Sequence, residues 1–242
     1  MLLQTNQNKL KFIISLPMEL QVIQYFIKQL ASNNSREWFQ QHKAEYDKVK
    51  KAHEEIVTQL ISQIALFDED IKGVQAKDCI FRIYRDVRFS PDKSPYKNHI
   101  GAYIASRGGR KSERAGYYLH IGADESFLSG GIYCPRPNVL KALREAVYHN
   151  IDEYLSIINQ KEFKNYFTEF FSDSLKKVPQ GFPKDFEHVE YLKYRHYSPA
   201  SPLSETLLKR KNYMEEFINR CEALYPYNCF MNFTVDECLS EE

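Results

Sequence analysis

The alternating residues of segment Phe81–Phe89 place the strongest restriction on how this chain can fold. Aromatic and β-branched residues occupy four of its five alternate positions, with Arg85 at the fifth, a pattern typical of a β-strand. Because the side chains of a strand point alternately to its two faces, the polar residues of this segment other than Arg85 share one face. They are Arg82, Tyr84, Asp86 and Arg88. We therefore predict a strand in which one face carries a group of charged side chains.

Two proline-containing breaks follow this predicted strand. Ser90-Pro91-Asp92 and Ser94-Pro95 should form a loop that presents Lys93 and Lys97. Residues 82–97 include five cations and two carboxylates, so the local electrostatic field is positive. Arginine and lysine side chains donate hydrogen bonds to phosphate or carboxylate. We expect the segment to bind an anion through these residues: Arg82, Tyr84, Arg88, Lys93, Tyr96 and Lys97.

Three stretches of the sequence also resemble a known family. They are FRIYRDVRFSPDKSPYK at residues 81–97, NNSREWF at 33–39 and LSGGIY at 128–133. The first agrees almost letter by letter with the pattern of the family called domain of unknown function 2461, and the resemblance extends over most of the chain. It implies a soluble, single-domain α+β protein. It supplies no reaction, so function has to be inferred from the residues themselves.

The segment after residue 97 continues the predicted sheet. Period-two alternation favours further strands within residues 79–134, and the short connections between them favour an antiparallel meander. The expected strands are Asn98–Ala105, Tyr117–Gly122 and Phe127–Cys134.

Hydrophobic positions spaced by three and four residues predict helices on both sides of this sheet region. They favour helices over residues 17–66, after a lead-in at 1–14 and a cap at Ser15, and a mostly helical region over 137–225. Within the second region, Tyr154–Ile158 and Phe163–Phe171 continue the helical spacing, and residues 191–197 alternate like one more strand. A final helix should start at Ser201-Pro202 and end at Pro226. We expect one α+β domain over residues 1–242, a twisted antiparallel sheet with helices packed on it.

Composition limits the compartment and the class of protein. Hydrophobic residues make up 43% of the chain, enough for a sizeable core, and the mean hydropathy of -0.54 argues against an integral membrane protein. The five cysteines form no CxxC pair, and no apolar run has the length of a signal-peptide core. We therefore expect a reduced, cytoplasmic protein without disulfides. The net charge of +1 predicts no general attraction to nucleic acid or membrane.

Three functions are compatible with this sequence. The first is binding of a phosphate-bearing small molecule or a nucleic-acid end on the face between Arg82 and Lys97. The second is an enzyme that acts on such a ligand with Asp86 and His99 as acid–base residues, because a carboxylate and an imidazole on neighbouring strands can move a proton. The third is a protein-interaction module whose basic loop, Arg107–Arg114, docks an acidic partner.

Asp86 also has a purely structural interpretation. It lies between two arginines on a strand predicted to be half-buried, and breaking a buried ion pair typically costs about 3–5 kcal/mol. We therefore expect its main role to be holding the arginines in orientation. Neither a cofactor nor a metal is expected, because His99, His120 and His196 follow no metal-ligand spacing.

Overall fold

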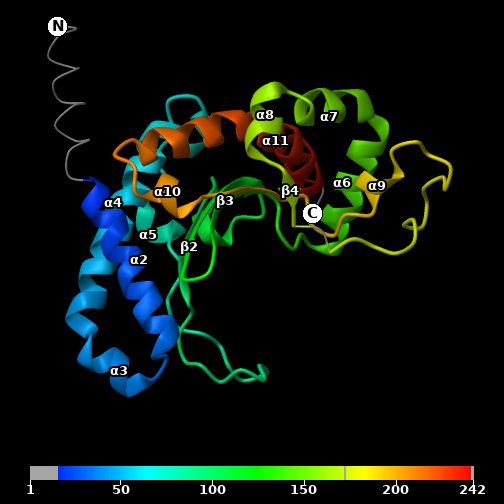
Figure 1. The fold of residues 1–242 in the computed structure, drawn as a ribbon. Coiled ribbons are helices and arrows are strands. Elements are labelled where there is room, and N and C mark those ends of the chain that lie inside the picture. Colours follow the sequence, from blue (N-terminus) through cyan, green and yellow to red (C-terminus); the bar gives the residue numbers. More distant parts are fainter. Residues whose placement is uncertain (1–15, 172, 241–242) are drawn as a thin grey trace, which may run out of the picture.

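An antiparallel sheet forms the centre of the fold. The computed structural model describes residues 16–171 and 173–240, so the expected lead-in at 1–14 and its cap Ser15 lie outside the described residues (Figure 1). The sheet has five strands in the order β1-β2-β3-β5-β4. Their bounds are β1 His99–Ile104, β2 Gly116–Gly122, β3 Ser126–Gly131, β4 Glu169–Phe170 and β5 Pro199–Pro202. The predicted α+β class and the meander of the first three strands are confirmed.

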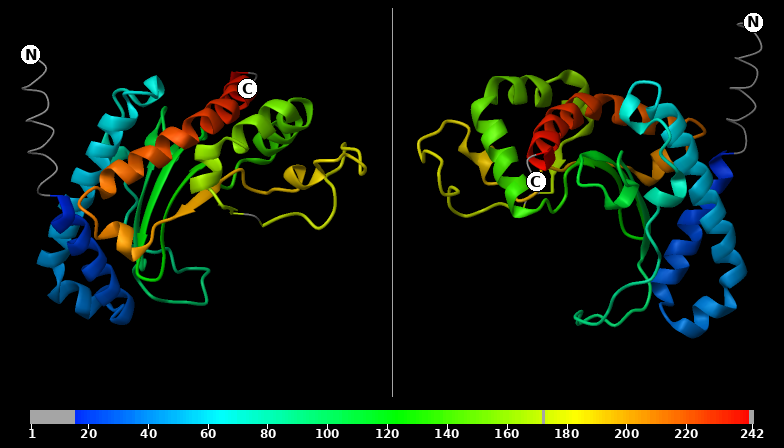
Figure 2. Two further views of the ribbon diagram at one scale, coloured as in Figure 1. Left: turned by 45° about the horizontal axis from the view of Figure 1, so that its top comes forward. Right: turned by 180° about the vertical axis from the view of Figure 1, so that it is seen from behind.

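The two faces of the sheet differ because side chains alternate along each strand. One face carries Ile100, Leu119 and Leu128, all of them buried. Helix α2 (Leu16–Ser32) contacts β2, and helix α11 (Tyr213–Ser240) contacts β3. A Cβ atom at Gly130 would lie 2.0 Å from Cδ2 of Leu224, so glycine is what allows α11 to approach this closely. In Figures 1 and 2 these helices lie along one side of the sheet.

The helices before the sheet form a compact antiparallel group. α2 is followed by α3 (Arg36–Gln41) and α4 (Lys43–Ile64), and α2 packs along α4. The side chain of Ser35 caps α3 by accepting a hydrogen bond of 3.1 Å from the Trp38 N–H. Three short helical turns lie nearer the sheet: η1 Glu69–Ile71, α5 Ala76–Cys79 and η2 Gly109–Lys111. Throughout the described part of the chain, no helix combines the length and the apolar character that crossing a membrane requires.

The region after β3 is mostly helical, as predicted, but several boundaries differ. The predicted strand at residues 191–197 is wrong, because α9 ends at Leu192 and strand β5 starts at Pro199. The helical spacing predicted over Phe163–Phe171 holds only to Tyr166, where α8 ends, since β4 follows and pairs with β5. The final helix starts at Tyr213 rather than at Ser201-Pro202, which lies in β5, and it continues past Pro226 instead of ending there. The helices are α6 Pro137–His149, α7 Ile151–Ile158, α8 Lys161–Tyr166, α9 Val189–Leu192, α10 Glu205–Leu208 and α11.

The predicted strand at Phe81–Phe89 is also wrong, although its alternation is real. Ile83 is buried and Arg82 and Tyr84 are exposed, as period two requires, but only isolated bridges pair this segment with its neighbours. A ladder does not form because prolines 91 and 95 lack an N–H and the Asp92 carboxylate binds the Ser94 N–H instead. Residues 81–97 form a long hairpin, here called the arm, which extends away from the sheet (Figure 1).

Two asparagines of α11 attach this helix to the sheet. Asn228 is buried, accepts a hydrogen bond of 2.9 Å from the Gly131 N–H, and donates one of 3.0 Å to the Gly116 carbonyl. Asn232 makes the corresponding pair of bonds with the backbone of Ala115, at 2.7 and 3.1 Å. The ends of β2 and β3 therefore find partners for their backbone groups in the side chains of a helix.

Candidate functional site

The base of the arm is fixed against the helices. Lys97 N–H donates to the Ile83 carbonyl at 2.8 Å, which joins the two sides of the arm. Tyr96 is buried, and its ring stacks on Phe39 with 4.0 Å between centroids. The Asn34 side chain donates to the Tyr96 carbonyl at 2.9 Å and accepts from the Tyr96 N–H at 3.1 Å. Tyr96 therefore anchors the arm to α3, and its ring is not free to contact a ligand.

The charged groups near the tip of the arm bind one another. Arg88 and Asp86 form an ion pair of 2.6 Å, Arg85 pairs with Asp92, and Lys93 donates to the Val87 carbonyl at 3.0 Å. The Arg88 guanidinium lowers the pKa of Asp86. The predicted ion pair of Asp86 is present, but both side chains are exposed, at 46% and 76%. Water and salt screen exposed pairs, so the large stabilisation expected of a buried pair is corrected to a small one.

A basic groove lies between the arm base and helix α4. It has a volume of about 800 Å³. Its lining includes seven cations and two carboxylates, the latter Asp47 and Glu54. The cations are Lys43, Lys50, Lys77, Arg82, Lys97, Arg110 and Lys111. Because the charges are so unequal, the groove favours an anion.

Most of these cations lack an acidic partner. Lys43 pairs with Asp47, but Lys50, Lys77, Arg82, Lys97 and Lys111 form no ion pair with any described residue. Lys97 is half-buried, and burial together with the nearby charge of Arg82 lowers its pKa. The Arg82 and Lys97 charges repel each other in the protein alone, and an anion between them would remove that repulsion.

One buried polar atom also lines the groove. His53 on α4 is 3% exposed, and its Nε2 has no hydrogen-bond partner among the described residues. Burial lowers the pKa of this imidazole to about 4, so it is neutral at physiological pH. A buried polar atom without a partner costs free energy, and such atoms in native proteins usually have a structural or functional reason.

A second cavity, here called the sheet pocket, lies on the face of the sheet opposite the one that carries buried Leu119 and Leu128. Its volume is about 700 Å³. Three rings from three neighbouring strands stack across its floor: His99 of β1, His120 of β2 and Phe127 of β3. The centroids are 4.2 and 4.5 Å apart, and the ring planes differ by 25° and 11°. The register of the strands places these side chains on one face.

The two histidines of this pocket are neutral at physiological pH. Burial is the largest cause, and the charge of nearby Lys97 adds to it; the pKa is lowered to about 4 for His99 and to about 3 for His120. The Tyr118 hydroxyl and Nδ1 of His120 share a hydrogen bond of 3.1 Å. A Cβ atom at Gly101 would lie 2.7 Å from the Tyr118 hydroxyl oxygen, so glycine makes room for this ring. Neutral imidazoles can both donate and accept hydrogen bonds.

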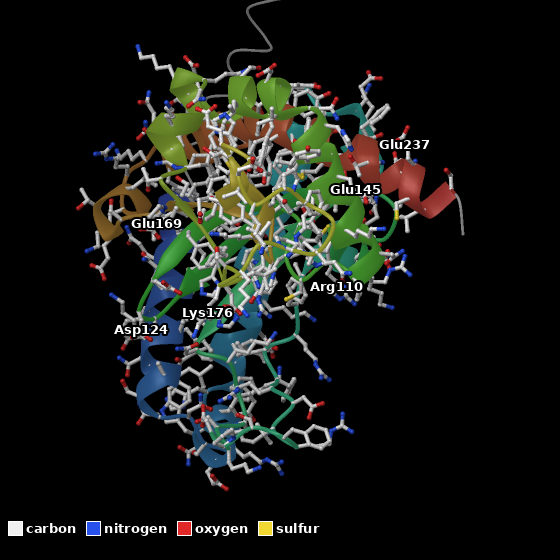
Figure 3. The ribbon with its side chains drawn as sticks, turned by 90° about the vertical axis from the view of Figure 1, so that its right-hand side faces the viewer. Arg110, Asp124, Glu145, Glu169, Lys176 and Glu237 are labelled. Carbon is white, nitrogen blue, oxygen red and sulfur yellow. The ribbon has the colours of Figure 1, made fainter. Side chains whose placement is uncertain are left out.

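The two cavities adjoin at three residues. Phe81, Lys97 and Arg110 line both the groove and the sheet pocket. The Arg110 guanidinium is oriented by two carbonyl oxygens, of Lys77 and Asp78, each at 2.9 Å. In Figure 3, Arg110 is labelled between the sheet and the arm that extends below it. A single ligand could therefore occupy both cavities.

The structure divides the expected site residues into two groups. Arg82, Tyr84 and Lys97 line the groove, and His99 lines the sheet pocket. The remaining four line neither cavity, and no contact in the described structure joins the expected acid–base pair of Asp86 and His99. These four are Asp86, Arg88, Lys93 and Tyr96.

Several lining residues were not among the expected site residues. His120, Tyr118 and Phe127 occupy the polar positions of alternating segments, so the period-two pattern was their signal. Arg110 belongs to the basic loop expected to dock an acidic partner, whereas nothing local in the sequence marks His53; they reach the groove from η2 and α4.

The basic loop expected to dock an acidic partner uses most of its cations within the chain. Arg107 pairs with Asp236 at 3.0 Å, and buried Arg114 pairs with Asp70 at 2.5 Å. Arg110 binds backbone carbonyls, as described above. These contacts hold the loop against α11 and the segment after α4, and they leave Lys111 as its one cation without a partner among the described residues.

A metal centre is not evident in the part of the chain described: it contains no group of three or more histidine, cysteine or acidic residues that could hold an ion.

Comparison with protein families matches residues 23–230 of this chain to the model described as conserved hypothetical protein (DUF2461). Comparisons with curated proteins and with solved structures give no match.

Proposed function

Since this chain belongs to the DUF2461 family, we propose from the residues of its own groove that it binds an anionic, phosphate-bearing ligand. The observation that carries this proposal is the seven-to-two excess of cations over carboxylates along the groove. The whole chain has a net charge of only +1, so the excess is local. Arg82 and Lys97 are the principal ligand-binding residues, and Tyr84 forms part of the wall.

The geometry supports phosphate in particular. Phosphate oxygens accept several hydrogen bonds at once, and arginine and lysine side chains are the usual donors. The groove offers both types of side chain from the arm, from α4 and from η2, so donors approach a bound anion from several directions. The neutral His53 imidazole adds a donor at the buried side of the groove.

The test is a calorimetric titration of inorganic phosphate and pyrophosphate at low and physiological salt. The variant Arg82→Gln/Lys97→Gln should bind at least about a hundredfold more weakly, because each charge-assisted bond contributes roughly 1.5–3 kcal/mol. The variant should remain folded, since neither side chain forms an ion pair with a described residue and the Lys97 ammonium contacts only the Phe81 ring.

The arm supplies a matched control. Arg88→Gln/Lys93→Gln removes the same amount of positive charge from the tip of the arm, outside both cavities. It should leave the dissociation constant within about twofold of the parent's, apart from a small salt-dependent change. Equal losses in the two double variants would mean that net charge rather than the groove determines binding, and an absence of binding by the parent would refute the proposal.

A further inference from the structure

The sheet pocket differs in chemistry from the groove it adjoins. Six aromatic rings line it, in addition to its two neutral histidines. Several of these rings are only partly buried, and Tyr133 is 65% exposed. The aromatic residues are Phe81, Tyr103, Tyr118, Phe127, Tyr133 and Phe171. Exposed faces of aromatic rings bind flat, unsaturated groups by stacking.

The pocket also offers hydrogen-bond groups suited to a heterocycle. His99 and His120 lie on its floor, and a neutral imidazole presents one donor and one acceptor. In each ring Nδ1 has a partner in the chain, Asn98 Oδ1 for His99 and the Tyr118 hydroxyl for His120, and Nε2 makes no hydrogen bond with a described residue. The edge of a nucleic-acid base has the same mixture of donors and acceptors. A purely aliphatic ligand would leave the two Nε2 atoms without partners, at a cost in free energy.

We propose that the sheet pocket receives the base of a nucleotide whose phosphate lies in the basic groove. The three residues shared by the cavities connect the two parts: Lys97 places its ammonium group 5.4 Å from the Phe81 ring centroid, at the boundary between the aromatic and the cationic surface. Aromatic rings beside a line of cations are the combination by which proteins bind single nucleotides and strand ends. The inference rests on the proposed function, because it takes the groove as the phosphate site.

A nucleotide unit can come from two sources, a free mononucleotide or the phosphorylated end of a single strand. The two sources share the same chemistry in the site. They differ in salt dependence, because a strand places further phosphates along cations outside the groove. Titration of both ligands at two salt concentrations distinguishes them.

The test compares ligands that carry the same phosphate and differ in whether a base is attached. Adenosine and cytidine monophosphates should bind about tenfold or more tightly than ribose 5-phosphate, which has the phosphate without a base. A 5′-phosphorylated trinucleotide represents the strand end in this experiment. If ribose 5-phosphate binds as tightly as the mononucleotides, the base site is refuted while phosphate binding stands. If neither inorganic phosphate nor any nucleotide binds, both proposals are refuted.

Substitutions of residues that line the sheet pocket test whether the base binds there. Phe127→Leu should lower nucleotide affinity about tenfold and leave the affinity for inorganic phosphate unchanged. Tyr133→Ala tests the same pocket at a side chain too exposed to be needed for folding, and it should weaken nucleotide binding several-fold. Its matched control is Tyr25→Ala on α2, because Tyr25 is also 65% exposed and lies outside the pocket. If Tyr133→Ala and Phe127→Leu both bind nucleotides like the parent, the base lies elsewhere and the inference is wrong.

Discussion

At the scale of single residues, the presence or absence of a partner decides what a charge can do. Arg88 and Arg82 are six positions apart and both exposed, but Arg88 is bound to Asp86 and Arg82 makes no ion pair with a described residue. The sequence predicts the same role for both, since both alternate onto the polar face. The partner of each side chain depends on the turns of the arm, which the alternation does not specify.

His53 gives the first prediction. Its folded-state pKa is lowered to about 4 by burial, whereas an unfolded histidine titrates near about 6.5. Between these values the unfolded state binds a proton that the folded state does not, so the free energy of unfolding falls as the pH falls. Acidification from pH 6.5 to 4 should remove about 3 kcal/mol through this residue alone. Urea unfolding at several pH values measures the effect.

Replacement of the imidazole isolates its contribution. His53→Leu should lose about 3 kcal/mol less than the parent over the same pH range, while His99 and His120 continue to destabilise both proteins at acid pH. His149→Leu, at an exposed position of α6, is the matched control and should follow the parent. Parallel pH profiles for His53→Leu and the parent would show that the buried imidazole does not titrate between these pH values.

At the scale of elements, the alternation of residue types along the sequence predicts which side chains are buried more reliably than it predicts which segments pair as strands. In Asn98–Ala105 and Tyr117–Gly122 the alternation correctly predicts that strands form and which side chains lie on each face of the sheet. In Phe81–Phe89 it predicts the burial of Ile83 between exposed Arg82 and Tyr84, but Phe89 on the same predicted face is 93% exposed, and proline and aspartate turns prevent a ladder.

The pairing of β4 with β5 could not be predicted. These strands have two and four residues, too few for a visible period, and β5 begins and ends with proline. The groove, too, could be predicted only in part, because the local sequence does not show how distant elements pack. Its cations come from the arm, α4, α5 and η2, and only the three-dimensional packing of these elements brings them together.

The attachment of the arm gives the second prediction. Asn34→Ala removes both hydrogen bonds to the Tyr96 backbone, across a separation of 62 residues in sequence. With about 1 kcal/mol for each bond, the free energy of unfolding should fall by about 2 kcal/mol. The control is Asn33→Ala, because the Asn33 side-chain amide is exposed and donates only to the Gln29 carbonyl in the last turn of α2. Equal losses in the two variants would refute the role of Asn34.

At the scale of the whole molecule, the helices leave one face of the sheet available. α2 and α11 cover the face that carries Leu119 and Leu128, and the sheet pocket occupies the other. The closed face therefore supplies stability, and the open face can carry polar and aromatic residues that a core would not accept. The same strands serve both purposes because neighbouring residues point in opposite directions.

The attachment of α11 gives the third prediction. Asn228→Leu keeps the volume of the side chain but leaves the Gly131 N–H and the Gly116 carbonyl buried without partners. The free energy of unfolding should fall by about 3 kcal/mol, measured by urea denaturation. Asn165→Leu, an exposed position on α8, makes the same chemical change outside the core and should shift stability by less than about 0.5 kcal/mol. A small loss for Asn228→Leu would mean that the sheet ends find other partners.

The single tryptophan lies beside the attachment point of the arm. Trp38 stacks on His42 with 4.0 Å between centroids, and its neighbour Phe39 holds Tyr96. All tryptophan emission of this chain therefore comes from the contact between α3 and its surroundings. During unfolding, an emission change that precedes the loss of helical circular dichroism reports local opening at α3, where the arm is attached. Coincident transitions would show that the arm and the helices separate as one cooperative unit.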